Sequence, residues 1–191
     1  MEPLIALFAL LAVGLAFRGG DDADARIDAP EDQYVFEGTD LSEHITARDA
    51  GGFINGVGGN DTIVGSDAED ALLGGTGNDI IIDALGQNRI EGGLGADSIP
   101  TVDNLNADGV YRHPSEYGTA DPVLGGFGAD QIFADDGDHV TAGTGRDTID
   151  IYVDLFRGQD LVTIPDFNTA EDTVEVSAGE GDPDDNIVTF G

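Results

Sequence analysis

A single apolar position recurs every nine residues through the middle of the chain. Counting from Gly38, the eighth place of each unit is apolar in seven consecutive units that end at Pro100. These residues are Ile45, Ile54, Ile63, Leu72, Ile81, Ile90 and Ile99, and Phe36 lies one period earlier. Because side chains alternate along a strand, a short strand over places seven to nine would bury the eighth side chain and turn its neighbours outward. The pattern predicts one short strand in every unit.

The places before each strand are rich in glycine, as in the unit GGTGNDIII at 74–82. Glycine accepts positive φ and close backbone approach, so the chain can turn sharply there. A strand of three residues is not stable alone, but stacked units would bury a continuous column of isoleucine. The repeat therefore predicts a solenoid.

A second block follows the first. Its units are EYGTADPVL from Glu116, GGFGADQIF from Gly125, the eight-residue ADDGDHVT, and AGTGRDTID from Ala142. Residues 101–115 break the period and are predicted to be an inserted loop. We therefore expect a first repeat block over 36–100, a second block with a closing segment over 116–176, and an acidic tail over 177–191.

The sixth place of many units is aspartate. If two units make one coil, loops eighteen residues apart stack, and Asp61, Asp79 and Asp97 form one file beside Asn60 and Asn78. Carboxylates stacked at about the spacing of strands, ~4.8 Å, would repel one another without a counter-ion. Hard cations with oxygen ligands relieve this repulsion, and calcium fits better than magnesium or zinc.

At these residues the chain resembles the RTX family of hemolysin-type calcium-binding nonapeptide repeats, whose form is GGxGxDxUx. Residues 74–82, 92–100 and 125–133 match this form fully, and 56–64 and 142–150 match it with one glycine replaced. The resemblance implies an all-β fold, a parallel β-roll (a right-handed β-solenoid). It also implies several Ca2+ ions between successive loops of one edge, held by the sixth-place Asp and by main-chain carbonyls.

The resemblance assigns metal-binding roles to the sixth-place aspartates and to residues of the glycine turns. They are Asp61, Asp79, Asp97, Asp130, Asp147, Gly56, Gly58, Gly74, Gly75, Thr76, Gly92, Gly93, Gly125, Gly126 and Gly143. On the opposite edge the sixth places are Gly52, Asp70 and Asn88, and most turn glycines are missing. We therefore expect calcium mainly between Asp61 and Asp79, Asp79 and Asp97, and Asp130 and Asp147, with the other edge weak or empty.

The net charge of the chain restricts the classes of molecule that it can bind. The chain has 39 Asp and Glu against 7 Lys and Arg, a formal net charge of −32, and no cysteine. This field repels phosphate, which excludes nucleic acid and anionic membrane surfaces as partners of the acidic part. The absence of cysteine excludes disulfides and zinc–thiolate sites. An acidic surface adapted to high salt is an alternative source of the charge.

The N-terminal residues 4–17 form an uninterrupted apolar run, LIALFALLAVGLAF. Its length suits the core of a signal peptide better than a full membrane span, although no Lys or Arg precedes it. Ala23-Asp24-Ala25 would supply a cleavage site, and a short uncleaved anchor that contacts the membrane is the alternative. Residues 21–35 are expected to be an acidic linker. Either reading places the bulk of the chain outside the cytoplasm, secreted or held at the cell envelope.

Other signals are weaker. Residues 104–109 (NLNADG) begin like an EF-hand loop, but Pro114 opposes an exiting helix, so a polar turn is expected. His44, His113 and His139 have no metalloprotease spacing. The acidic pairs show no accompanying pocket, so no catalytic residues are assigned.

These observations favour a non-enzymatic calcium-binding protein whose folding is coupled to calcium. One alternative is an adhesive or surface-layer element with a cell-surface partner. Another is an accessory module or remnant of a secreted hydrolase or epimerase, although the non-repeat residues leave little room for a catalytic domain.

Overall fold

The fold is described from a computed structural model, which covers residues 25–28, 35–47, 51–83, 85–101, 120–135, 137–153 and 161–178. The described residues form strands and turns and contain no helix. The strands are β1 (Ala25–Asp28), β2 (Val35–Glu37), β3 (Glu43–Thr46), β4 (Phe53–Asn55), β5 (Thr62–Val64), β6 (Ala71–Thr76), β7 (Ile80–Ile82), β8 (Arg89–Leu94), β9 (Ser98–Pro100), β10 (Pro122–Phe127), β11 (Gln131–Ala134), β12 (His139–Thr144), β13 (Thr148–Val153) and β14 (Thr173–Ala178).

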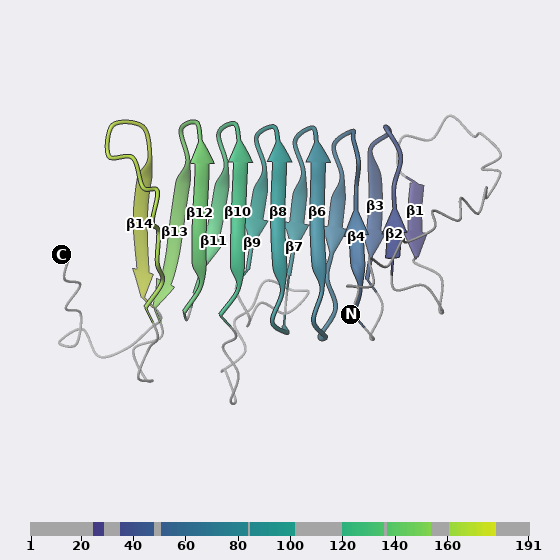
Figure 1. The fold of residues 1–191 in the computed structure, drawn as a ribbon, viewed down its shortest axis with the longest axis horizontal. Helices are drawn as coiled ribbons and strands as arrows, with labels where there is room; N and C mark the ends of the chain where they lie inside the picture. Colours follow the sequence, from purple (N-terminus) through teal and green to yellow (C-terminus); the bar gives the residue numbers. More distant parts are fainter. Residues whose placement is uncertain are drawn as a thin grey trace, which may run out of the picture.

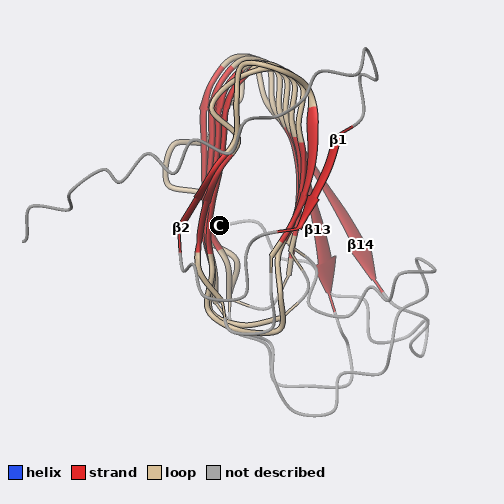
Figure 2. Ribbon diagram, turned by 90° about the vertical axis from the view of Figure 1, so that its right-hand side faces the viewer, coloured by secondary structure: helices blue, strands red, loops and turns tan. Residues whose placement is uncertain are grey.

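The strands form two parallel sheets. Sheet A has the order β1-β3-β5-β7-β9-β11-β13-β14, and sheet B has the order β12-β10-β8-β6-β4-β2. Successive strands alternate between the sheets, so the chain winds through both in each coil (Figure 1). Seen end on, the two sheets face each other and stacked turns join them along both edges (Figure 2). The prediction of an all-β parallel β-roll is confirmed; the N-terminal apolar segment lies outside the described residues.

One coil contains two repeat units. Ile63 pairs with Ile81 in sheet A and Leu72 with Ile90 in sheet B, each eighteen residues apart. The stack continues past the predicted insertion, because β9 pairs with β11 and β8 pairs with β10 in the same register of eighth-place residues. Both repeat blocks therefore share the same two sheets.

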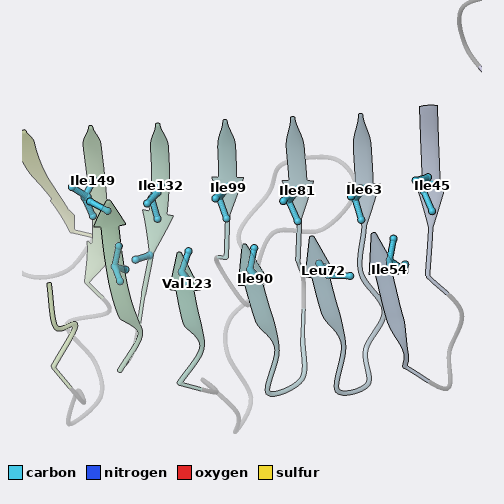
Figure 3. Close-up of a cluster of buried hydrophobic side chains, with 13 residues drawn as sticks. Ile45, Ile54, Ile63, Leu72, Ile81, Ile90, Ile99, Val123, Ile132 and Ile149 are labelled. Carbon is cyan, nitrogen blue, oxygen red and sulfur yellow. The ribbon is translucent and has the colours of Figure 1, made fainter. Parts of the chain in front are cut away.

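The eighth-place side chains form the core, as predicted. Those of sheet A and those of sheet B lie in two facing rows between the sheets (Figure 3). Strand β7 shows the alternation clearly, since Ile81 is fully buried while Ile80 and Ile82 are exposed. Burying a side chain of this size contributes roughly 1.5–3 kcal/mol, which the short strands could not supply through backbone pairing alone. The core is thus a column repeated along the roll.

Four strands of sheet B are longer than the repeat predicts. The strands β6, β8, β10 and β12 have six residues each and continue into the glycine turn. Gly75 pairs with Gly93, and Thr76 with Leu94, so the backbone ladder runs on past the core. This extension fixes the spacing of the turns through main-chain hydrogen bonds.

Two terminal features differ from a simple repeat. Residues 25–28, which fall within the expected linker, form β1 and pair with β3 at the edge of sheet A. At the other end, Asp166 accepts hydrogen bonds from the N–H groups of Ala142 (3.1 Å) and Gly143 (2.8 Å) on the last strand of sheet B. These bonds pair backbone N–H groups at the edge of sheet B, where no further strand of the sheet accepts them.

Within the part of the chain that the structure describes, no helix could cross a membrane.

Candidate metal centre

The turns that lead from sheet B to sheet A make up the first edge. They end at Asp61, Asp79, Asp97, Asp130 and Asp147, and they follow the upward arrowheads of the sheet B strands in Figure 1. The turns that lead from sheet A to sheet B make up the second edge. Their corresponding residues are Asp70, Asn88, Asp121 and Asp138.

A ladder of hydrogen bonds joins the aspartates of the first edge. Asp61 N–H donates to Asp79 Oδ1 and Asp79 N–H donates to Asp97 Oδ1, each over 2.8 Å. Asp97 donates in the same way to Asp130, and Asp130 to Asp147, each over 2.9 Å. The five sixth-place aspartates therefore lie in one file, with all five side chains buried.

The second carboxylate oxygen of each of these residues has no hydrogen-bond partner. This holds for Oδ2 of Asp61, Asp79, Asp97, Asp130 and Asp147, all of which are buried. A buried polar atom without a partner costs about 1–3 kcal/mol, and more when it is charged. Five such oxygens in one file are therefore a cost that a bound cation would remove.

The first-place glycines show what surrounds these oxygens. A Cβ atom at Gly74 would lie 2.6 Å from the carbonyl oxygen of Gly92 in the next turn and closer still to Asp79 Oδ2. The same pair of oxygens, one carboxylate and one carbonyl of the following turn, meets the corresponding point at Gly56, Gly92 and Gly125. Each interval between turns thus gathers oxygen atoms around a space that only glycine leaves open.

This donor set fits calcium. Ca2+ takes six to eight oxygen ligands from carboxylates, backbone carbonyls and water, and tolerates irregular geometry. Among the described residues no group of three or more His, Asp or Glu side chains converges, so main-chain carbonyls would have to supply most ligands. Asp79 Oδ2 and the Gly92 carbonyl would hold an ion in one interval, which neutralises the buried carboxylate.

Burial also changes the acidity of the file. It is the largest cause that raises the pKa of Asp97 to about 6, and the charges of Asp130 and Asp79 add to it, while the hydrogen bond from Asp79 N–H opposes it. The pKa values of Asp61 and Asp130 rise to about 6 and those of Asp79 and Asp147 also rise, with burial as the largest cause in each. Without a cation, the fold disfavours the ionised carboxylates.

The second edge has a ladder of its own but satisfies its side chains differently. Asp70 N–H donates to Asn88 Oδ1 (2.6 Å), and Asn88 N–H donates to Asp121 Oδ1 (2.7 Å). Asp70 Oδ2 accepts from Ser66 N–H (2.7 Å) and Ser66 Oγ (2.8 Å). At the end of this ladder, Asp70 Oδ1 is buried without a partner. Asp70 Oδ2 is therefore paired with protein donors, unlike the Oδ2 atoms of the first edge.

The remaining residues of the predicted metal site lie in the glycine turns. Gly75, Gly93, Gly126 and Gly143 occupy the second place and have φ between 101° and 115°. Val57 takes the same place with φ of 77°, so this turn holds a β-branched residue in a strained backbone conformation. Thr76 is exposed and Gly58 faces its hydroxyl, which puts both at the outer side of the turn.

Three features of the first edge were not predicted from the nonapeptide repeat. The insertion hides that Asp97 and Asp130 are neighbours, so an additional interval joins the predicted ones. Glu43 and Asp172 extend the file at its ends, since Glu43 N–H donates to Asp61 Oδ1 (2.8 Å) and Asp147 N–H donates to Asp172 Oδ1 (3.2 Å). Glu43 stands at the sixth place of its unit and could have been found; Asp172 lies outside the period.

The rival signals do not converge on a site within the described residues. His139 is exposed, with Nδ1 2.5 Å from Thr163 Oγ1, and His44 lies on strand β3. Residues 104–109 and His113 lie outside the described residues.

Comparison with known proteins agrees with this geometry. The family model described as "RTX calcium-binding nonapeptide repeat (4 copies)" matches residues 49–81, 64–99 and 117–149. These residues of the chain are therefore RTX calcium-binding nonapeptide repeats, as their motifs predicted, and RTX nonapeptide repeats bind Ca2+ ions. No curated protein and no solved structure matches the chain significantly.

Proposed function

We propose that this protein is a non-enzymatic, calcium-binding β-roll whose folding is coupled to extracellular Ca2+. The observation that carries the proposal is the file of buried Oδ2 atoms without partners, each beside a carbonyl oxygen of the next turn. The oxygens meet only when successive turns are stacked. Binding at this edge would therefore require the fold, and the fold would gain stability from binding.

The energies support coupling. Extracellular calcium modules bind with dissociation constants of roughly 10⁻⁴–10⁻³ M, far above cytosolic calcium. At a hundredfold excess over the dissociation constant, one site adds about 2.7 kcal/mol. Typical domains have only about 5–15 kcal/mol of stability in all, so three or four sites could decide whether the roll forms. The chain would be poorly ordered before export and compact outside the cell.

The export route and anchorage belong to the same proposal. The apolar run at 4–17 would direct the chain out of the cytoplasm, either as a cleaved signal or as an anchor that keeps the roll at the envelope. Ca2+ is abundant only outside the cytoplasm, so highly charged sites of weak affinity would be filled only after export.

The test is a pair of titrations on the full chain, one with calcium chloride and one with sodium chloride, followed by far-ultraviolet circular dichroism. We expect strand signal to appear cooperatively at millimolar calcium and to disappear on chelation. Folding that requires molar salt and ignores calcium would contradict the proposal and favour an acidic surface adapted to high salt.

A structural role is a second candidate. Leu94 and Phe127 are exposed neighbours on sheet B, with relative exposures of 51% and 62%, and they pair in register. Such a pair could contact a second surface while calcium keeps the roll rigid. Calcium-dependent self-association or retention on cells, lost on changing Leu94 and Phe127 to Ser, would favour an adhesive or surface-layer element. Hydrolysis or epimerisation by the isolated chain would instead favour an enzyme-derived module.

A further inference from the structure

The turn between β7 and β8 on the second edge contains an amide where the first edge has carboxylates. Asn88 occupies the sixth place of its unit, and its side chain is 1% exposed. Its Oδ1 accepts the N–H of Asp70, which is the same rung that each Asp Oδ1 makes on the first edge. Asn88 Nδ2 therefore corresponds to the Oδ2 atoms that have no partner.

Nδ2 of Asn88 is surrounded by oxygen atoms. It donates to Asp83 Oδ2 (2.5 Å) and to the carbonyl oxygens of Leu85 and Gly86 (both 2.9 Å). A carboxylate and two main-chain carbonyls of one turn thus converge on a single point. This is the class of donor set that a hard cation takes, and here a protein N–H₂ group fills it.

The orientation of the amide follows from these partners. Asp70 N–H can donate only to an oxygen, and the three groups around the other atom can only accept. Exchange of Oδ1 and Nδ2 would therefore place two donors together on one side and four oxygen atoms together on the other. The observed orientation is the one that places donors opposite acceptors on both sides of the amide.

We propose that Asn88 excludes calcium from its turn by filling the oxygen cluster with its amide, so that this part of the second edge is ordered without a metal ion. The inference rests on the proposed calcium role of the first edge. It goes beyond that role because it names the residue that decides which turn binds an ion. Asn88 would then be a specificity-determining residue for the number and position of bound ions.

The central experiment exchanges the amide for a carboxylate. Asn88→Asp replaces the donor with an oxygen, so that Asp83 Oδ2 and the carbonyl oxygens of Leu85 and Gly86 face a fourth oxygen instead of an N–H₂ group. We expect this variant to bind one more Ca2+ per chain than the wild type, measured by equilibrium dialysis of the full chain. We also expect its folding midpoint in calcium to rise roughly tenfold, because a buried donor has been lost.

Gln87→Glu is the matched control. Gln87 is exposed in the same turn, so this change adds the same charge without entering the oxygen cluster. It should leave the ion count and the folding midpoint within error of the wild type. Asn88→Ala removes the amide without adding charge; it should raise the calcium midpoint but add no ion.

Each outcome decides the proposal. It is overturned if Asn88→Asp binds no more calcium than Gln87→Glu, or if it stays unfolded in saturating calcium, since calcium should then replace the amide. If the wild type instead folds without calcium, the proposed function fails separately. The inference is then tested by thermal melting in chelator, where Asn88→Asp must melt lower than Gln87→Glu and recover on calcium addition.

Discussion

The two edges of the roll use the same kind of ladder, in which side-chain oxygens accept hydrogen bonds from the backbone of the neighbouring turn. They differ in the second polar atom of each rung. On the first edge, Asp79 Oδ2 and its equivalents are buried without a partner. On the second edge, Ser66 donates to Asp70 Oδ2, Thr101 donates to Asp138 Oδ2, and Asn88 donates to its own turn. A bound cation would pair the Oδ2 atoms of the first edge, whereas protein groups already pair these three atoms of the second edge.

The repeat motif therefore has two separable parts. The isoleucine column and the ladder are common to both edges and hold the stack together. The repeated first- and second-place glycines and the file of Oδ2 atoms without partners belong to the first edge, where they leave room for an ion. A change at the first edge should therefore affect calcium and stability together, whereas a change at the second edge that adds no oxygen ligand should affect stability alone.

The largest expected effect comes from removing one rung of the first edge. Asp79 lies between two intervals, so Asp79→Ala should lose two ions and, at a hundredfold excess of calcium, about 5 kcal/mol of unfolding free energy. Asp70→Ala is the matched change on the second edge and should lose few or none. Calcium counting and chemical denaturation in calcium measure both quantities. Equal ion loss in the two variants would contradict the one-edge assignment.

Filling an interval should have about half that effect. In Gly74→Ala the new Cβ would occupy the space between Asp79 Oδ2 and the Gly92 carbonyl oxygen. We expect the loss of one ion and about 2.7 kcal/mol at the same calcium excess, read from the same two measurements. Ala142 is the chain's own comparison, since it holds the first place of the last first-edge turn. Unchanged calcium binding by Gly74→Ala would show that the ion lies elsewhere.

The acidity of the file gives a pH dependence. The pKa values of Asp61, Asp97 and Asp130 lie near 6, above the ordinary value of 3.8. Between these values the folded, metal-free chain binds more protons than the unfolded chain. Its stability from these groups is therefore full below about pH 4 and is lost as the pH rises through 6.

Calcium binding follows the opposite trend, because it needs the ionised carboxylates. At pH 5 a group with a pKa of about 6 is protonated about ten to one, so the affinity of each such site should be about tenfold lower than at pH 7. Calcium titrations at both pH values measure this shift, and thermal melts in chelator measure the metal-free trend. An affinity that does not change with pH would contradict the buried, protonated state of the file.

The smallest expected effect is a gain. Val57 holds a φ of 77° at a place where the other first-edge turns have glycine. Val57→Gly should remove this strain and stabilise the roll by about 1 kcal/mol. Leu73→Gly, within the regular strand β6 of sheet B, is the control and should destabilise the roll. A loss of stability in Val57→Gly would show that the valine side chain contributes more than its backbone costs.

The sequence by itself determined the period, the inward eighth residue and the file of aspartates. Each follows from local rules, because alternation along a strand fixes which side chain is buried and glycine marks the turn. It could not show that Asp97 and Asp130 are neighbours, since a long insertion separates them and only strand pairing joins β9 to β11. Nor could it show that Asp172 continues the file from outside the period.

Only the tertiary structure showed which buried carboxylate oxygens have a hydrogen-bond partner. Asp70 and Asp79 both stand at the sixth place, yet Asp70 Oδ2 accepts a hydrogen bond from Ser66 while Asp79 Oδ2 has no partner. Whether a buried oxygen is satisfied depends on atoms brought together by stacking, not on residue type. The sequence supplied the carboxylates, and the stack determined which of their oxygens have a hydrogen-bond partner.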